Sequence, residues 1–124
     1  MAAATKQQIE FYIGSQGYAS GAEYIFKNSP EVGVFRHSDN HKWFAVFMTI
    51  SYEKLGLHKS GSVDILNLKC VPPLAAGVVD RKCIFPAYHM NKTHWISILL
   101  DGSADMENIV SLIDLSFHLT STRN

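Results

Sequence analysis

The residues best suited to chemistry lie in one stretch, residues 85–95, which reads Phe-Pro-Ala-Tyr-His-Met-Asn-Lys-Thr-His-Trp. Two imidazoles, an amide, an ammonium group and several aromatic rings in so short a segment could bind a metal ion or a nucleic acid. Asn91 and Lys92 stand where a turn belongs, because asparagine tolerates left-handed backbone angles. If they form the centre of a hairpin, His89 lies opposite His94 on one side of a sheet. We therefore expect these two histidines to be cross-strand neighbours.

A metal site in this stretch would lack a third ligand. Catalytic zinc sites use three protein ligands, and residues 85–95 contain no cysteine, aspartate or glutamate. The two cysteines, Cys70 and Cys83, do not have zinc-site spacing, and Cys70 falls on the inward side of an expected strand. The chain also lacks Gly-x-Ser-x-Gly, glycine-rich phosphate-loop and His-Glu-x-x-His motifs. The sequence thus predicts a protein that is not an enzyme, with no metal and no cofactor.

Composition indicates a single domain that spans residues 1–124. The chain is 47% hydrophobic and 18% charged, the balance of an ordinary soluble globular protein. No apolar run approaches the roughly 20 residues of a membrane helix, and the first residues lack the apolar segment of a secretory signal. Two cysteines are too few for a disulfide framework. We expect a cytoplasmic protein with no membrane partner.

Charge is balanced overall but distributed unevenly. The chain has 11 basic and 11 acidic side chains, which argues against strong nonspecific binding of nucleic acid. Residues 36–92 hold eight basic and four acidic residues, whereas residues 93–124 hold one basic and four acidic residues. The middle of the chain can therefore contribute a basic face.

Hydrophobic periodicity predicts the elements that position these residues. Three helices are expected, at residues 5–16, 72–79 and 105–120. Besides the hairpin segment, four strands are expected, at residues 32–36, 42–50, 63–70 and 96–100. Strands joined by short turns, with helices at both ends, indicate an α+β domain: an antiparallel β-sheet with the terminal helices packed on it.

Side-chain alternation predicts which residues form the core. In the strand at 42–50, one face should carry Phe44, Val46, Met48 and Ile50. In the strand at 63–70, Leu66, Leu68 and Cys70 should point inward, and Asn67 and Lys69 outward. One core cluster is expected from these faces and those of the helices: Ile13, Val46, Met48, Leu66, Leu68, Ile98, Ile113 and Phe117.

Residues 88–95, Tyr-His-Met-Asn-Lys-Thr-His-Trp, resemble the MmcQ/YjbR family, and further matches run in order along nearly the whole chain. These are Phe-Arg-His at 35–37 with Lys-Trp-Phe-Ala at 42–45, Asn-Leu-Lys-Cys at 67–70, and Leu-Ile-Asp-Leu-Ser at 112–116. One departure is Val-Pro-Pro at 71–73, where family members usually carry Asp-Pro after the Lys-Cys pair. The resemblance implies a small α+β fold with an antiparallel sheet, and DNA binding through a double-wing arrangement.

A nucleic-acid hypothesis follows from the resemblance together with the basic and aromatic residues. Basic groups would hold phosphates, while aromatic rings would stack on bases. The expected site, which would bind DNA weakly and in a salt-dependent way, consists of Arg36, Lys42, Lys69, His89, Asn91, Lys92, His94 and Trp95. Two alternatives stay open: the aromatic residues are core and the charges a solvated rim, or the chain is a non-enzymatic protein-interaction module.

Overall fold

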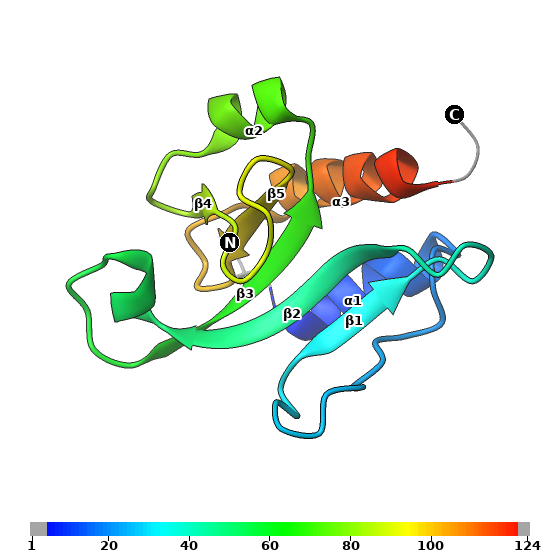
Figure 1. Cartoon of the computed structure of the whole chain (residues 1–124), viewed down its shortest axis with the longest axis horizontal. Coiled ribbons are helices and arrows are strands. Elements are labelled where there is room, and N and C mark those ends of the chain that lie inside the picture. Colours follow the sequence, from blue (N-terminus) through cyan, green and yellow to red (C-terminus); the bar gives the residue numbers. More distant parts are fainter. Residues whose placement is uncertain (1–4, 122–124) are drawn as a thin grey trace.

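A computed structural model describes residues 5–121 and shows a β-sheet with helices α1 and α3 on one side (Figure 1). Its five strands are all antiparallel to their neighbours, in the order β1-β2-β3-β5-β4. The strands are β1 Gly33–Arg36, β2 Trp43–Ser51, β3 Ser62–Lys69, β4 Ile84–Pro86 and β5 Trp95–Leu99. The helices are α1 Lys6–Ser15, α2 Pro72–Val78 and α3 Met106–Thr120, with a 3-10 turn, η1, at Tyr52–Leu55. The α+β fold class expected from the sequence is confirmed.

Local sequence signals fix where the helices begin. Thr5 and Gln8 form a reciprocal capping box, in which the Gln8 N–H donates to Thr5 Oγ1 at 3.2 Å and the Thr5 N–H to Gln8 Oε1 at 3.0 Å. Asp105 accepts the Asn108 N–H at 2.8 Å and so caps α3. α2 opens with Pro72, whose missing N–H costs nothing in the first turn. Within the described residues, no helix is long and apolar enough to cross a membrane.

The main core lies between α1, α3 and the side of the sheet that we call the covered face. Ile9 and Ile13 of α1 and Ile109 and Ile113 of α3 are fully buried there. The strands contribute Phe35, Phe44, Ala45, Phe47, Leu66, Leu68, Ile96 and Ile98. Phe117 packs against this cluster while remaining partly exposed. The expected grouping of Ile13, Leu66, Leu68, Ile98, Ile113 and Phe117 is therefore confirmed.

A β-bulge at Phe44 overturns part of the expected core. β2 pairs Ala45 with Phe35 but Trp43 with Arg36, so Phe44 is an extra residue in the ladder. The bulge turns Phe44 to the covered face, and the prediction that it shares a face with Val46 and Met48 was wrong. Val46 and Met48 instead pack on the opposite side of the sheet, outside the main core.

Ser116 of α3 bridges the ladder beside this bulge. Its hydroxyl donates to the Phe44 carbonyl at 2.5 Å and accepts the Lys69 N–H at 2.9 Å. Both backbone groups are thereby satisfied where β2 and β3 cannot pair directly. A helix side chain thus fixes the end of the sheet at which Lys69 lies.

The opposite side of the sheet, which we call the open face, has no α-helix packed on it in the described part of the chain (Figure 1). Its apolar side chains form two small clusters, one around Val34 and Val46 and one around Ile65 and Phe85. Residues 87–94, yellow in Figure 1, loop in front of β3 on this side. Asn67 points to this face as expected, but it is fully buried rather than exposed to solvent.

Candidate nucleic-acid interface

Residues 87–94 form a loop rather than the tight hairpin expected from the sequence. β4 and β5 pair only as far as Pro86 and Ile96. Extending that register would place Tyr88, and not His89, opposite His94. His89 also has a φ of 63°, which breaks the extended backbone a strand requires. The prediction that His89 and His94 are cross-strand neighbours was therefore wrong.

Asn91 does shape a turn, although this turn lies one residue later in the chain than expected. Its side-chain Oδ1 accepts the backbone N–H groups of Thr93, at 2.8 Å, and His94, at 3.2 Å. Asparagine commonly closes such turns by hydrogen bonding to backbone groups two residues on. The amide oxygen of Asn91 is thus engaged in holding the loop, and the role of Asn91 in DNA binding stays a prediction.

A buried polar pair fastens the loop to the open face. Ser97 Oγ donates to Asn67 Oδ1 from the neighbouring strand, and Asn67 Nδ2 donates to the Tyr88 carbonyl at 3.1 Å. The Tyr88 N–H completes the set by donating to Ser97 Oγ at 2.9 Å. The sequence signal was a polar residue, Ser97, inside an apolar run, together with Asn67, which alternation along its strand had placed toward solvent.

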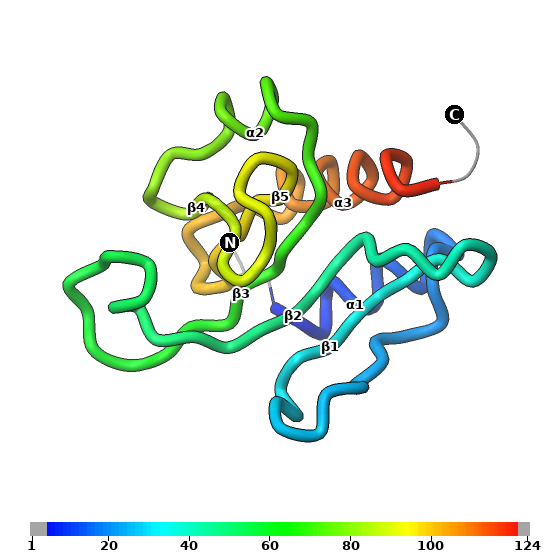
Figure 2. Tube along the Cα trace, in the orientation of Figure 1, coloured from blue at the N-terminus to red at the C-terminus, as the bar shows by residue number. Residues whose placement is uncertain are grey.

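Arg36 is neutralised by a carboxylate that lies 13 positions away in the sequence. Its Nε donates to Glu23 Oε2 at 2.9 Å and its Nη2 to Glu23 Oε1 at 2.8 Å, a bidentate ion pair. Figure 2 shows the chain between α1 and β1 running along the outer edge of β1, where Glu23 bridges to Val34. Arg36 therefore has its charge offset and its guanidinium donors partly engaged.

Lys69 and two tryptophans gather at one end of the open face, which we call the Trp–Lys end. Lys69 is directly opposite Trp95 across the β3–β5 pair. Trp43 begins β2, which runs antiparallel beside β3, and it packs in the Val34 and Val46 cluster. All three side chains are half-exposed. This end brings together two of the predicted residues, Lys69 and Trp95, with an aromatic neighbour.

The other predicted cations do not join the Trp–Lys end as one surface. Lys42 is exposed in the turn between β1 and β2. Lys92 folds back across its loop, where its Nζ donates to the Ala87 carbonyl at 2.7 Å. It also lines a cleft with Lys54 and Arg81, on the side of the loop that faces β4 and η1. The single basic face expected from the sequence is thus divided into separate groups.

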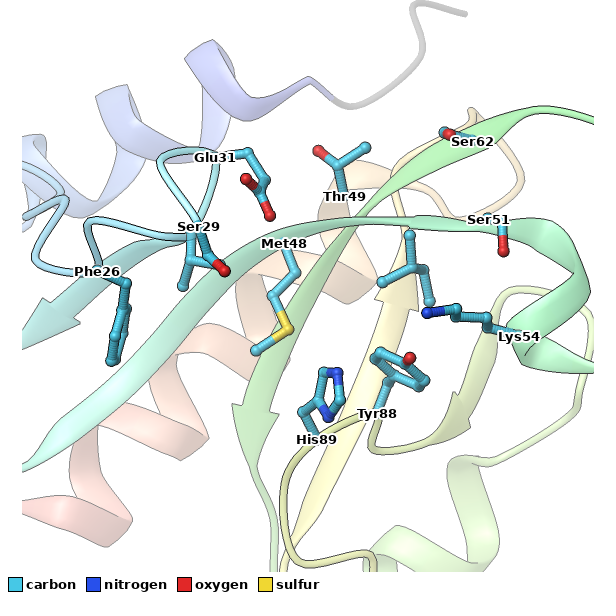
Figure 3. Close-up of a pocket in the computed structure, with 12 residues that line it drawn as sticks. Phe26, Ser29, Glu31, Met48, Thr49, Ser51, Lys54, Ser62, Tyr88 and His89 are labelled. Carbon is cyan, nitrogen blue, oxygen red and sulfur yellow. The ribbon is translucent and has the colours of Figure 1, made fainter.

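A pocket of about 510 Å³ opens on the open face beside the loop (Figure 3). Met48, Tyr88 and His89 lie side by side in it, and the rings of Tyr88 and His89 are 4.1 Å apart. Lys54 enters from η1, with its Nζ 5.9 Å from the centre of the Tyr88 ring, and Glu31 lies across the pocket. His89 is therefore a pocket residue, whereas His94 is exposed elsewhere on the loop.

The two thiols of the chain are held in their neutral form. Burial raises the pKa of Cys70. Burial also raises the pKa of Cys83, and the hydrogen bond to Asp80 and the charge of that carboxylate add to the effect. Nucleophilic cysteines need the opposite shift, because the thiolate is the reactive species. Among residues 5–121, no three histidine, cysteine or acidic side chains gather as a metal ion would require.

Other titratable groups lie on the covered side of the sheet and serve packing. Tyr12 and Tyr18 both donate to Asp114 Oδ1, at 2.6 and 2.8 Å, and burial followed by that hydrogen bond raises the pKa of Tyr18 to about 12. His37 is buried, with Nε2 2.7 Å from Thr120 Oγ1. These contacts tie α1 and the β1–β2 turn to α3, away from the open face.

The family model for YjbR matches residues 19–119 of this chain. The chain belongs to the YjbR family. A curated YjbR-like relative is uncharacterized protein YyaQ of Bacillus subtilis (strain 168), which is 42% identical over 116 residues, or 94% of this chain and 98% of YyaQ. The family resemblance drawn from residues 88–95 is confirmed.

Solved structures share the YjbR-like fold. A crystal structure of a Pseudomonas syringae protein has a TM-score of 0.90 at 40% identity, covering 95% of this chain and 100% of that one. A crystal structure of a Deinococcus radiodurans protein has a TM-score of 0.71 at 20% identity, covering 96% of this chain and 80% of that one. The second likeness shows the fold alone. Together they support the sheet architecture on which the Trp–Lys end depends.

Proposed function

We propose that this YjbR-family protein is a DNA-binding protein that contacts DNA weakly through the Trp–Lys end of the open face. The observation that carries the proposal is the direct opposition of Lys69 and Trp95 on a sheet face over which no α-helix of residues 5–121 packs. A lysine places a positive charge beside a phosphate, while an indole ring offers a surface on which a base can stack. The pairing therefore supplies both kinds of contact within one patch.

Lys69 is available for such a contact. It is half-exposed, and within residues 5–121 no carboxylate forms an ion pair with its ammonium group. Its backbone is held by the bond from its N–H to Ser116 Oγ, so the side chain projects from a fixed point. Arg36 lacks this availability because Glu23 already pairs with it. Lys69 is thus better placed than Arg36 to bind a phosphate.

The half-exposed tryptophans favour single-stranded over duplex DNA. Stacking on an indole requires a base that is not paired inside a helix, and Trp43 and Trp95 each expose only part of the ring system. With zero formal net charge and few cations in the patch, we expect dissociation constants on the order of 10⁻⁴–10⁻⁶ M. Affinity should fall with salt by a logarithmic slope of about 0.7 for each phosphate contact on a single strand.

Tryptophan fluorescence titration with single-stranded and duplex oligonucleotides of equal length tests the proposal. Lys69→Gln should weaken binding to all sequences and reduce the salt slope by about one contact. Lys6→Gln is the matched control, because Lys6 has its Nζ 5.3 Å from the Phe47 ring centre on the covered side. It removes the same charge and should leave affinity nearly unchanged. Failure of both DNA forms to bind at low salt and near-millimolar protein would contradict the proposal.

Trp95 supplies a separate test of stacking. Trp95→Phe keeps an aromatic ring and should retain most of the affinity, whereas Trp95→Leu should lose about 1–3 kcal/mol of binding free energy. Circular dichroism of both variants checks that the fold survives the change. Equal binding by the two variants would mean that Trp95 does not stack on bases and that phosphate contacts account for the binding.

A second function, a non-enzymatic protein-interaction module, is favoured by an apolar run beside β1. Tyr24, Ile25 and Phe26 expose 52%, 48% and 40% of their surface at consecutive positions. Adjacent exposed apolar residues of this size commonly mark protein contacts. This function takes precedence if neither form of DNA binds, and a change in self-association on Tyr24→Ser would support it.

A further inference from the structure

We propose that Lys54, Arg81 and Lys92 form a binding site for a phosphate group, separate from the Trp–Lys end. The three side chains come from η1, the turn before β4 and the loop after it, and they line one cleft of about 220 Å³. No single stretch of sequence contains the site. It forms only when the loop of residues 87–94 folds over the open face.

The cleft gathers positive charge without a compensating carboxylate. Among the residues the structure describes, no aspartate or glutamate lines it, and none of its three cations has an ion-pair partner. Asp80 lies next to Arg81 in sequence, but its Oδ1 accepts the N–H groups of Lys82, Cys83 and Ile84 at 2.9, 3.0 and 3.0 Å. That carboxylate therefore closes the turn and does not line the cleft.

Two of the cations have contacts that restrict their side chains, and Lys54 also borders the larger pocket that Glu31 lines. Lys92 donates through Nζ to the Ala87 carbonyl at 2.7 Å, which fixes its ammonium group while leaving two N–H donors free. Lys54 holds its Nζ 5.9 Å from the centre of the Tyr88 ring. A site whose donors are already placed loses less side-chain freedom when an anion binds.

Arg81 occupies a backbone conformation that costs stability. Its φ is 58°, a left-handed value that glycine or asparagine adopts more readily. Strain of this kind persists where the surroundings impose it, and it clusters at functional sites. A glycine or asparagine here would relieve the backbone but would remove the planar guanidinium that binds phosphate in a bidentate manner.

Phosphate is the ligand that this set of groups fits. Three cations match a phosphate monoester, which carries close to two negative charges and three acceptor oxygens at neutral pH. A phosphodiester in a nucleic-acid strand presents the same oxygens with a single charge. The shared chemistry is a tetrahedral phosphate, and its source is either a free phosphate or nucleotide or the backbone of a nucleic acid.

Titration of ¹⁵N-labelled protein with inorganic phosphate, at ionic strength held constant with chloride, tests the site directly. We expect saturable shifts of the amides of Lys54, Arg81 and Lys92. Arg81→Gln keeps an unbranched side chain at the strained position and should weaken binding about ten-fold. Arg81→Lys keeps the charge and should restore part of that loss. Lys82→Gln is the matched control, since Lys82 is exposed in the same turn but does not line the cleft.

The proposal is overturned if phosphate shifts none of these amides, or if Arg81→Gln and Lys82→Gln weaken binding equally. A second arm uses a 5′-mononucleotide, and a third a single-stranded oligonucleotide without terminal phosphates. Competition by the mononucleotide alone supports a free-phosphate source, and competition by the oligonucleotide supports a backbone source. Because the first arm contains no nucleic acid, failure of DNA binding at Lys69 leaves this site standing, and failure of phosphate binding leaves the DNA proposal standing.

Discussion

The two faces of the sheet differ in how their side chains are packed. On the covered face, α1 and α3 enclose a continuous apolar cluster that runs from Phe35 to Ile98 across four strands. On the open face, apolar side chains form two small clusters, and the strand centres carry the polar residues Asn67 and Ser97. The covered face stabilises the fold, while the open face holds loops, a pocket and unpaired cations in place.

The contrast between the two faces indicates where a ligand can bind in so small a domain. A fully packed surface cannot bind a ligand without losing core contacts, whereas a surface covered only by loops can. Here the open face is not loosely built, because the Asn67–Ser97 pair anchors residues 87–94 to the strands. The open face therefore combines fixed geometry with access for a ligand.

Loss of a covered-face aromatic should have the largest effect. Phe44 is fully buried and its ring lies 6.2 Å from that of Phe35 and 5.0 Å from that of Phe117. Phe44→Ala should lower the free energy of unfolding by about 3–5 kcal/mol, measured by urea denaturation. A loss below about 1 kcal/mol would mean that the bulge does not turn this residue into the main core.

Loss of the buried hydroxyl on the open face should have an intermediate effect. Ser97→Ala leaves Asn67 Oδ1 and the Tyr88 N–H without a partner, at a cost of about 1–3 kcal/mol. Amide hydrogen exchange should also accelerate in residues 87–94 while the helices stay protected. Uniform acceleration across α1 and α3 would break the proposed separation between the two faces.

Acid should destabilise the protein through the covered side of the sheet. Burial lowers the pKa of His37, and the charges of His118 and Lys42 add to this, whereas Asp39 and a hydrogen bond to the Phe117 backbone oppose it. His37 therefore binds a proton more readily in the unfolded chain than in the folded one. Its contribution to the free energy of unfolding is complete above the unfolded pKa of about 6.5 and is lost as the pH falls below that value.

The measurement for His37 is the dependence of unfolding free energy on pH between about 7 and 5. The other five histidines of the chain have exposed side chains, which makes His37 the main candidate. His37→Gln should flatten the slope, even if it lowers stability at every pH. An unchanged slope in this variant would assign the acid sensitivity to other groups.

The smallest effect on stability is expected for Lys69→Gln on the open face. The side chain is half-exposed and forms no ion pair with another described residue, so the unfolding free energy should change by less than about 0.5 kcal/mol. Thermal denaturation of Lys69→Gln and Phe44→Ala side by side compares how much each face contributes to stability. A loss of several kcal/mol would show that Lys69 serves the fold instead of a ligand.

The fold was predictable because its elements carry local signals. The capping box at Thr5, the proline pair at Pro72 and the Asp105 cap each mark a helix start, and these depend on neighbours in sequence. Alternation in the second half of β3 likewise placed Leu66 and Leu68 in the core. Such features need no knowledge of distant contacts.

The site was less predictable because it depends on contacts between distant residues. Glu23 neutralises Arg36 across 13 positions, and Ser97 satisfies Asn67 across 30. The bulge at Phe44 reversed the expected facing, and only the pairing with β1 reveals it. The β4–β5 pairing is one residue out of the expected register and ends at Pro86, so His89 and His94 lie in a loop and are not paired. Alternation within one strand carries none of this information.

The decisive measurement for DNA binding at the open face is ¹⁵N NMR mapping of a bound single-stranded oligonucleotide at low salt, because it reports every amide and both indole N–H groups at once. We expect shifts for Lys69, Trp95 and the indole N–H groups of Trp43 and Trp95, reduced by added salt and by Lys69→Gln. The amides of α1 and α3 should stay in place. Shifts confined to the helices, or no shifts at near-millimolar concentration, would contradict the assignment of function to the open face.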